Sequence, residues 1–506
     1  MTDTAAHTAA EDDPAVLIGT DVRIDGTTEI DTVEIDTAAG TVRGRSVDGV
    51  ARFLGVPFAA PPVGELRFAA PQPAPPWTGV RDATADGPNA PQPTRAIPGI
   101  DLTPILGRGW RKGEDYLTLD VWTPEPGGAG RPVMVFIHGG SFIAGEPGAP
   151  VYDGTALARG GVVLVSVTYR LGVEGFLPLA GGATNIGLRD QIAALAWVRD
   201  NVAAFGGDPG QVTVFGESAG AMSLGCLLGS PLSKGLFQRA IVQSGGAEMV
   251  RSAPLAARFA ANLTAQLGVA PEAAALRELT YETTLAAQEA VSDPALRGDL
   301  REPDGIDPGF GLGGFTPVLG DDVLPRHPLQ AIAAGAAADV DLIVGSNHDE
   351  MNLYYVPTGV GDVVTAEQVH AMLAAVHPRS DELLAGSDPT PGAALTRVMN
   401  DLVFQGPTRR LAEAHAGTGT GRTYLYDFAW RSSACGGRLG ACHGLELPFV
   451  FDTLAAATGP EGMLGDGGPQ ALVDELCGAW TAFARSGDPG WTPYTAASPT
   501  PHRFDA

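Results

Sequence analysis

Positive charge is scarce in this chain of 506 residues, which has 32 lysines and arginines against 58 aspartates and glutamates. The formal charge of −26 repels nucleic-acid phosphates and anionic lipid headgroups. The composition therefore argues against nucleic-acid and membrane partners. The hydrophobic fraction of 44% is nevertheless sufficient for a large globular core.

Cysteine is also rare, and the chain contains only Cys226, Cys435, Cys442 and Cys477. So few cysteines exclude a disulfide scaffold, and the absence of a C-x-x-C pair argues against a zinc site. Cys435 and Cys442 are close enough in sequence to bridge a short loop, so this pairing stays open. We expect buried free thiols instead.

Long apolar runs are missing too, since no stretch approaches the ~18 apolar residues of a membrane span. The N-terminus, "MTDTAAHTAAEDDPAVLIG", has neither the basic nor the apolar region of a signal peptide. We therefore expect a cytoplasmic protein of bacterial type.

Residues 1–35 are acidic and poor in aromatics, so we predict a flexible N-terminal extension. Residues 36–506 contain no clean linker and no internal repeat, and we predict one domain there. "TVEIDTAAGTVRGRS" alternates like an antiparallel hairpin. Ala-rich helical stretches near 254–330 and 355–420 do not alternate with strands, and we predict insertions that cover one end of the sheet.

Short β-branched runs predict strands that are buried on both faces of a mostly parallel sheet. They are "PVMVFIHGG", "GVVLVSVTYR", "QVTVFGES", "RAIVQSGG", "DLIVGSN" and "RTYLYDFAW". Between the second and third, apolar residues recur at helical spacing up to Gly206 and Gly207. This alternation of strands and helices predicts an open α/β sheet.

Ser218 lies in "VTVFGESAGA", between a predicted strand and a predicted helix. A G-x-S-x-G turn at such a junction forces the serine into strained backbone angles and raises its hydroxyl above the sheet. The same turn leaves the Ala219 amide at a helix N-terminus, where it faces a developing anion. We therefore predict that Ser218 is a nucleophile.

A nucleophilic serine needs a base and an acid. His443 in "ACHGLELPFVF" follows the last predicted strand. In α/β sheets with a G-x-S-x-G turn the catalytic residues come in the chain order serine, acid, histidine, which suits this late position. His502 is expected to be solvated, and His370, His377 and His415 are expected at the surface. For the acid, "VGSNHDEMN" offers Asp349 and Glu350, and the pattern alone does not choose between them.

Two glycine-rich segments call for opposite interpretations. "FIHGGSFIAG" ends a strand, so backbone amides at 138–141 are candidates for an oxyanion hole. "GFGLGG" at 309–314 satisfies G-x-G-x-x-G, but it lacks the strand and helix that a dinucleotide site requires. There is also no P-loop and no HExxH motif, so we expect no cofactor and no metal.

The motifs together resemble the type-B carboxylesterases, a family that includes cholinesterases and bacterial para-nitrobenzyl esterases. The resemblance runs in order from "GTVRGRSVDGVARFLGVPFAAPPVGELRF" through "EDYLTLDVWTP", "FGESAGAMS", "SNHDEMN" and "HGLELPFVF" to "FARSGDPGWTPY". It implies the α/β-hydrolase fold and a serine carboxylesterase that acts on small-molecule esters.

The resemblance also implies residue roles. Ser218 matches the nucleophile, His443 the base and Glu350 the acid, which resolves the choice against Asp349. Gly140, Ser141 and Ala219 match the oxyanion donors, and Gly139 shapes their turn. Glu217 and Ser244 match positions beside the triad.

The chain departs from the family pattern at several positions. Met351 follows the acid where glycine is usual, which puts the geometry of the acid loop in question. Ser141 replaces a third glycine of the oxyanion loop. Ala90 and Tyr116 stand where secreted members have cysteines, in keeping with a reducing compartment.

Two other functions remain open on the sequence. A carbamate, amide or lactone hydrolase would use the same triad, because the insertions read the leaving group. A non-catalytic module, like the cholinesterase-like adhesion domains, would typically lack a triad member. The natural substrate, the acyl preference and the oligomeric state are not determined by the sequence.

Overall fold

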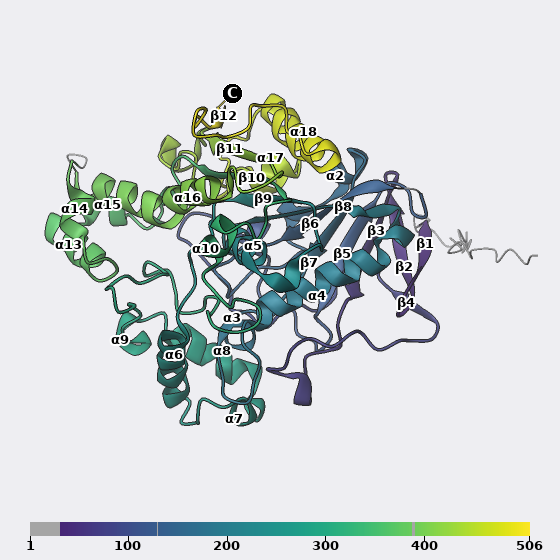
Figure 1. The fold of residues 1–506 in the computed structure, drawn as a ribbon, viewed down its shortest axis with the longest axis horizontal. Coiled ribbons are helices and arrows are strands. Elements are labelled where there is room, and N and C mark those ends of the chain that lie inside the picture. The colour runs from purple at the N-terminus through teal and green to yellow at the C-terminus, as the bar shows by residue number, and fades with distance from the viewer. Residues whose placement is uncertain (1–30, 129, 387–389, 506) are drawn as a thin grey trace, which may run out of the picture.

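The computed structural model describes residues 31–128, 130–386 and 390–505. Its centre is a mixed 12-stranded sheet in the order β1-β2-β3-β5-β7-β6-β8-β9-β10-β11-β12, with β4 pairing to β2 (Figure 1). The strands are β1 Thr32–Thr37, β2 Gly40–Val47, β3 Val50–Pro57, β4 Val80–Asp82, β5 Thr118–Thr123, β6 Arg131–Ile137, β7 Val163–Val167, β8 Gly207–Glu217, β9 Arg239–Gln243, β10 Asp341–Asn347, β11 Thr423–Phe428 and β12 His502–Phe504.

The helices lie on both faces and at one end of this sheet. They are α1 Thr103–Leu106, α2 Thr155–Arg159, α3 Gly172–Phe176, α4 Ile186–Asn201, α5 Ala219–Gly229, α6 Ala253–Gln266, α7 Ala273–Arg277, α8 Tyr281–Ala290, α9 Pro294–Arg297, α10 Pro328–Ala333, α11 Asn352–Tyr355, α12 Val360–Val363, α13 Ala366–Ala374, α14 Ser380–Leu384, α15 Pro391–Asn400, α16 Gly406–His415, α17 Leu447–Val450 and α18 Gln470–Ser486. Short 3₁₀ turns occupy Gly64–Leu66, Pro150–Tyr152, Val202–Phe205, Pro231–Ser233, Ala434–Gly437 and Leu454–Ala457, and one π turn occupies Asp401–Gln405.

The six strands predicted from apolar runs are present as β6 to β11, and they pair in parallel. Within β6, Val133 and Val135 pack into one hydrophobic cluster, whereas Met134 and Phe136 pack into the other. This alternation follows from the pleat of a strand and explains why both faces require apolar side chains. In Figure 1, α4 lies on one side of the strands and α18 on the other.

The predicted N-terminal hairpin is confirmed, because β1 pairs with β2 in antiparallel register. Since β1 begins at Thr32, the ordered sheet starts slightly before residue 36. The proposed flexible extension falls mainly on residues 1–30, which lie outside the described residues. The domain division therefore stays a prediction.

The predicted helix before Gly206 is also present, as α4 followed by a 3₁₀ turn. Gly206 ends that turn in a left-handed conformation with φ 84°. The Ala-rich stretches form α6 to α9 and α13 to α16. Most of these helices lie at the end of the molecule away from β1 to β4 (Figure 1).

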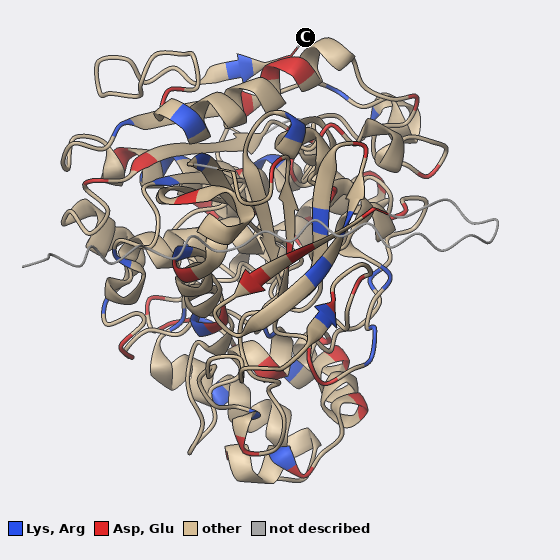
Figure 2. Ribbon diagram, turned by 90° about the vertical axis from the view of Figure 1, so that its right-hand side faces the viewer, with Lys and Arg blue, Asp and Glu red and all other residues tan. Residues whose placement is uncertain are grey.

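Acidic and basic residues are interspersed along the ribbon in Figure 2. Many of the basic side chains pair with carboxylates, as Arg43 does with Glu34. Across the described ranges, no helix has the length and apolar character needed to cross a bilayer.

One ion pair fastens α4 to the loop after β7. Asp190 accepts hydrogen bonds from Arg170, at 2.9 Å from its backbone N, 2.8 Å from Nε and 2.7 Å from Nη2. Both side chains are buried, and Arg170 Nη1 also donates to the Ala69 carbonyl at 2.8 Å. Loss of either charge would leave the other buried and unpaired.

We therefore expect Asp190→Asn to lower the free energy of unfolding by about 3–5 kcal/mol, because it leaves the Arg170 charge uncompensated. Asp200→Asn is the matched control on the same helix, since Asp200 pairs with Arg199 at the surface. That change should cost less than about 1 kcal/mol. Urea denaturation of the three proteins measures the difference, and equal midpoints for both variants would contradict the expectation.

Candidate active site

Ser218 lies at a tight turn between β8 and α5 with φ 55° and ψ −123°. This backbone conformation is strained for a residue with a side chain. A Cβ at Gly220 would lie 2.0 Å from the Ile137 carbonyl oxygen, and one at Gly216 would lie 2.8 Å from the same oxygen. Both glycines are therefore required by the close approach of α5 to β6.

His443 lies in the loop after β11 and connects the serine to a carboxylate. Its Nε2 is 2.8 Å from Ser218 Oγ, and its Nδ1 is 2.6 Å from Glu350 Oε2. All three residues are buried. The His443 amide also donates to the Glu350 carbonyl at 3.2 Å, which fixes the two loops against each other.

The two candidate acids lie in different surroundings. The second oxygen of Glu350, Oε1, accepts the Asn347 amide at 2.7 Å. Asp349 instead has its Oδ2 2.7 Å from Arg431 Nη1 and 3.0 Å from the Ala441 amide. The structure thus brings Glu350, and not Asp349, to the imidazole.

Met351 does not disturb this loop. Its backbone has φ −71° and ψ −8°, an ordinary helical conformation that does not call for glycine. Its amide donates to Asn400 Oδ1 at 2.7 Å, and its side chain is buried. The doubt raised by this departure from the family pattern therefore has no basis in the geometry.

The predicted oxyanion loop follows β6. Gly140 has φ 111° and Ser141 has φ 58°. At Gly139, a Cβ would lie 2.7 Å from Glu217 Oε2 and 3.0 Å from Ser218 Cβ, so only glycine fits beside the serine. Within the described part of the chain, no group accepts a hydrogen bond from the amides of Gly140, Ser141 or Ala219. These amides are available to an anion.

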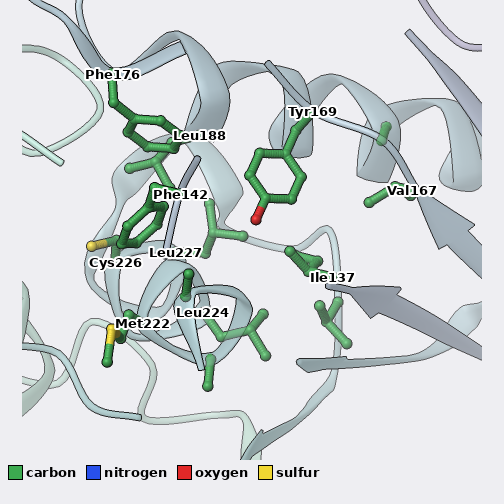
Figure 3. Close-up of a cluster of buried hydrophobic side chains, with 14 of the residues drawn as sticks. Ile137, Phe142, Val167, Tyr169, Phe176, Leu188, Met222, Leu224, Cys226 and Leu227 are labelled. Carbon is green, nitrogen blue, oxygen red and sulfur yellow. The ribbon is translucent and has the colours of Figure 1, made fainter. Parts of the chain in front are cut away.

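The oxyanion loop is anchored by the next residue, Phe142. Its ring packs against Phe176 with centroids 4.7 Å apart, near Met222 of α5 (Figure 3). Its carbonyl accepts the Gly172 amide at 2.7 Å. The loop is therefore held in place by a buried aromatic contact.

The two predicted neighbours of the triad differ in their contacts. Glu217 Oε1 lies 3.1 Å from His443 Nε2, on the same side as Ser218. Ser244 has φ 55°, and its amide donates to the Gly345 carbonyl at 2.8 Å. Its buried hydroxyl has no hydrogen-bond partner among the described residues.

Sequence reasoning missed a buried polar group behind the acid. Glu446 accepts hydrogen bonds from Gln243 Nε2 at 3.0 Å and Asn347 Nδ2 at 2.6 Å. Asn347 also supplies the amide that holds Glu350, so it links the two carboxylates. In the sequence, only the position of Glu446 three residues after His443, in "HGLE", hints that this carboxylate lies near the site. Phe404, from the π turn, was also missed, and its ring lies 4.5 Å from that of His443.

The remaining histidines and cysteines complete the comparison with the sequence. The surface expectation is wrong for His377 and His415, which are buried. His502 is only partly exposed, because it begins β12 and stacks on Trp491. The four cysteines are free thiols, so Cys435 and Cys442 form no bridge, and Cys435 is exposed rather than buried.

Burial and neighbouring charge act in opposite directions on the imidazole. Burial by itself lowers the pKa of His443, but the charges of Glu217 and Glu350 outweigh it and raise that pKa to about 9. Burial raises the pKa of Glu217 to about 8. The adjacent pair therefore retains a proton into the alkaline range.

Two cavities meet at Ser218. One has a volume of about 130 Å³ and is lined by His443, Glu217, Gly140 and apolar side chains that include Ile97 and Ile105. The other has a volume of about 20 Å³ and is lined by Ala219, Phe142, Met222, Phe315 and Phe404. Ser141, Ser218 and Tyr354 line both. The serine thus separates a larger space beside the imidazole from a smaller apolar space.

Comparison with known proteins agrees with this geometry. The model of the carboxylesterase family matches residues 31–502. The chain belongs to the carboxylesterase family. It has the α/β-hydrolase fold and is a serine carboxylesterase that hydrolyses carboxylic esters. The hydrogen-bonded path through Ser218, His443 and Glu350 argues against the non-catalytic module, which would typically lack one of these residues.

Relatives and solved structures support this membership. The para-nitrobenzyl esterase of Bacillus subtilis (strain 168) is 37% identical, over 90% of each chain. The phenmedipham hydrolase of Pseudarthrobacter oxydans is also 37% identical, again over 90% of each chain. Among solved structures, a PNB esterase superposes with a TM-score of 0.80 at 34% identity, over 93% of this carboxylesterase and 95% of that chain.

We expect Glu217→Gln to move the acidic limb of the kcat/KM profile to lower pH. The change removes a negative charge 3.1 Å from the imidazole, so the pKa of His443 falls and its neutral form is populated at lower pH. The measurement is para-nitrophenyl acetate hydrolysis across pH 5–10.

Asp349→Asn is the matched control, because that neighbouring carboxylate pairs with Arg431 rather than His443. Its profile should coincide with that of the wild type. A limb that stays in place in Glu217→Gln would show that Glu217 does not stabilise the imidazolium.

Proposed function

We propose that Ser218, His443 and Glu350 carry out the ester hydrolysis, through an acyl-enzyme intermediate. The continuous hydrogen-bonded path from Ser218 Oγ through the imidazole to Glu350 is the observation that carries this assignment. We also assign Gly140, Ser141 and Ala219 as oxyanion donors, with Gly139 leaving room for the turn.

In this mechanism His443 takes the Ser218 proton as Oγ attacks the ester carbonyl. The free backbone amides stabilise the negative oxygen of the tetrahedral intermediate. His443 then gives the proton to the leaving alcohol, and Ser218 retains the acyl group. Water, deprotonated by the same imidazole, attacks the acyl-enzyme and releases the acid. Glu350 orients the ring and stabilises its cationic form throughout.

The same geometry assigns the two sides of the substrate. The leaving oxygen must lie near His443 Nε2, so the alcohol part occupies the cavity of about 130 Å³ beside the imidazole. The carbonyl oxygen points to the amides, which leaves the acyl part to the apolar cavity of about 20 Å³. We therefore propose esters with a larger alcohol and an acyl group that is slender next to the carbonyl, where the cavity is small.

The names of relatives suggest the first compounds to test. One relative is a para-nitrobenzyl esterase, and para-nitrobenzyl alcohol is a bulky leaving group of the kind proposed here. Phenmedipham and fumonisin B1 are named in two others. The carbamate, amide and lactone alternatives share the proposed triad, so substrate turnover has to separate them.

The proposed partner is a small-molecule ester, with no nucleic acid and no membrane. The cytoplasmic location expected from the sequence stays a prediction, as does the absence of a cofactor or metal.

We expect Ser218→Ala to abolish para-nitrophenyl acetate hydrolysis, because it removes the nucleophile. Glu350→Gln should lower kcat by about a thousandfold or more, because it no longer stabilises the imidazolium. Asp349→Asn should stay close to the wild type. Steady-state kinetics on variants whose thermal unfolding matches the wild type measures these effects. Full activity in Glu350→Gln would remove Glu350 from the mechanism.

The cavity assignment predicts that benzyl acetate is hydrolysed at least about tenfold faster, in kcat/KM, than its isomer methyl phenylacetate. In the first ester the ring belongs to the alcohol, and in the second it belongs to the acyl part. Product formation followed by chromatography measures the ratio. A preference for methyl phenylacetate would reverse the assignment of the two cavities.

A further inference from the structure

The glycine-rich segment Gly309–Gly314, which does not form a dinucleotide site, forms a wall of the catalytic pocket. Gly309, Leu312 and Gly313 line the small cavity on the acyl side of Ser218. Phe310, Gly311 and Leu312 line a second cavity on the other side of the segment. Leu312 therefore belongs to both, and a single stretch of backbone separates the two spaces.

The two cavities differ greatly in size. The acyl cavity has about 20 Å³, whereas the cavity beyond Leu312 has about 650 Å³. The larger one lies between the two predicted insertions, because α9 and the following loop form one side and α13 and α15 the other. The mechanism proposed above does not use it.

A buried ion pair fixes this partition. Arg251 Nη2 lies 3.1 Å from Asp307 Oδ1 and donates to the Gly313 carbonyl at 2.7 Å. The two oxygens of Asp307 accept the amides of Gly309 at 2.9 Å and Gly311 at 3.0 Å. Both charged side chains are buried, so the ends of the glycine-rich segment are held while the Leu312 side chain remains only partly covered.

The chemistry of the larger cavity favours an apolar occupant. Its lining includes Leu300, Phe310, Tyr355, Val376, Leu395 and Met399. The two arginines that line it have internal contacts, since Arg301 pairs with Asp299 and Arg297 Nη1 donates to the Gly311 carbonyl. A hydrocarbon chain gains more from such a surface than a charged group does.

We propose that this cavity is a second acyl-chain compartment, and that Leu312 is the specificity-determining residue at its entrance. Flexible linear acyl chains that exceed the small cavity extend past Leu312 into the larger one, whereas a ring next to the carbonyl does not bend past the partition. The inference rests on the proposed placement of the acyl part on this side of Ser218.

The first test narrows the compartment far from the reacting atoms. Ala375, an exposed residue at the end of α13, lines the larger cavity. Ala371, one turn earlier, is also exposed but does not line it. Ala375→Trp should lower kcat/KM for para-nitrophenyl octanoate and decanoate by about tenfold or more. It should leave the acetate within about twofold, and Ala371→Trp should change neither ester by more than that.

The second test opens the partition. Leu312→Ala should raise the octanoate-to-acetate ratio of kcat/KM by about tenfold, because the removed side chain separates the two spaces. Adding Ala375→Trp to Leu312→Ala should cancel this gain. A ratio that stays raised in the double variant would place the long chain elsewhere.

A binding measurement separates this inference from the proposed catalytic roles. In the Ser218→Ala background, titration with para-nitrophenyl octanoate should give a Kd about tenfold higher when Ala375→Trp is added, and no change with Ala371→Trp. This difference in Kd is expected whether or not the triad assignment is right. The triad assignment is tested separately, by the kinetics of Ser218→Ala. The proposed compartment is ruled out if Ala375→Trp and Ala371→Trp behave alike. It is also ruled out if the wild type hydrolyses para-nitrophenyl acetate but no para-nitrophenyl ester with an acyl chain longer than butyrate.

Discussion

The close approach of α5 to β6 is the constraint on which the proposed catalytic centre depends. Gly216 and Gly220 allow the helix backbone to reach the Ile137 carbonyl, and the chain between them has room for only one turn. Ser218 therefore takes a conformation with positive φ, and its backbone amide donates a hydrogen bond to the Gln243 carbonyl at 2.9 Å. This turn raises the hydroxyl toward His443 and directs the Ala219 amide to the proposed oxyanion position. Presenting the hydroxyl and presenting the amide thus depend on the same strained turn. The packing of the sheet offsets the free-energy cost of that strain.

A second constraint is the concentration of buried carboxylates around one imidazole. Glu217 and Glu350 contact the two ring nitrogens of His443, and Glu446 lies behind them with Asn347 and Gln243 as donors. Buried carboxylates are tolerated only when they are hydrogen-bonded or paired. Here the side-chain amides of Gln243 and Asn347 donate hydrogen bonds to Glu446. The imidazole of His443 pairs with Glu217 and Glu350. In the proposed mechanism the same arrangement also tunes His443 as the base, because it favours the cation that forms as Ser218 attacks.

The substrate side is built by segments far from the sheet in sequence. The glycine-rich wall at 309–314 is held by Arg251 and Asp307, while Tyr354 and Phe404 come from the later helical segments. Such loops vary without disturbing the strands, whereas Ser218 and the oxyanion loop are fixed by β8 and β6. The family membership thus accounts for the ester chemistry. The insertions line the proposed acyl space, whereas residues 95–106 and the loops around Ser218 and His443 line much of the proposed alcohol space. In the motif that superficially matched a dinucleotide site, Gly311 takes a left-handed conformation, and a Cβ at Gly309 or Gly314 would collide with Arg251 or Phe259.

The sequence by itself determined the elements whose causes are local. Apolar runs predicted β6 to β11, and the glycines around Ser218 predicted the elbow, because strand pleat and backbone crowding act over a few residues. Only the tertiary structure decided what depends on distant segments. It brought Glu350 rather than Asp349 to His443, since Asp349 is held by Arg431 from another loop. It also placed Glu446, Phe404 and the partition at Leu312 around the site, because long-range packing sets those neighbours and no sequence spacing records it.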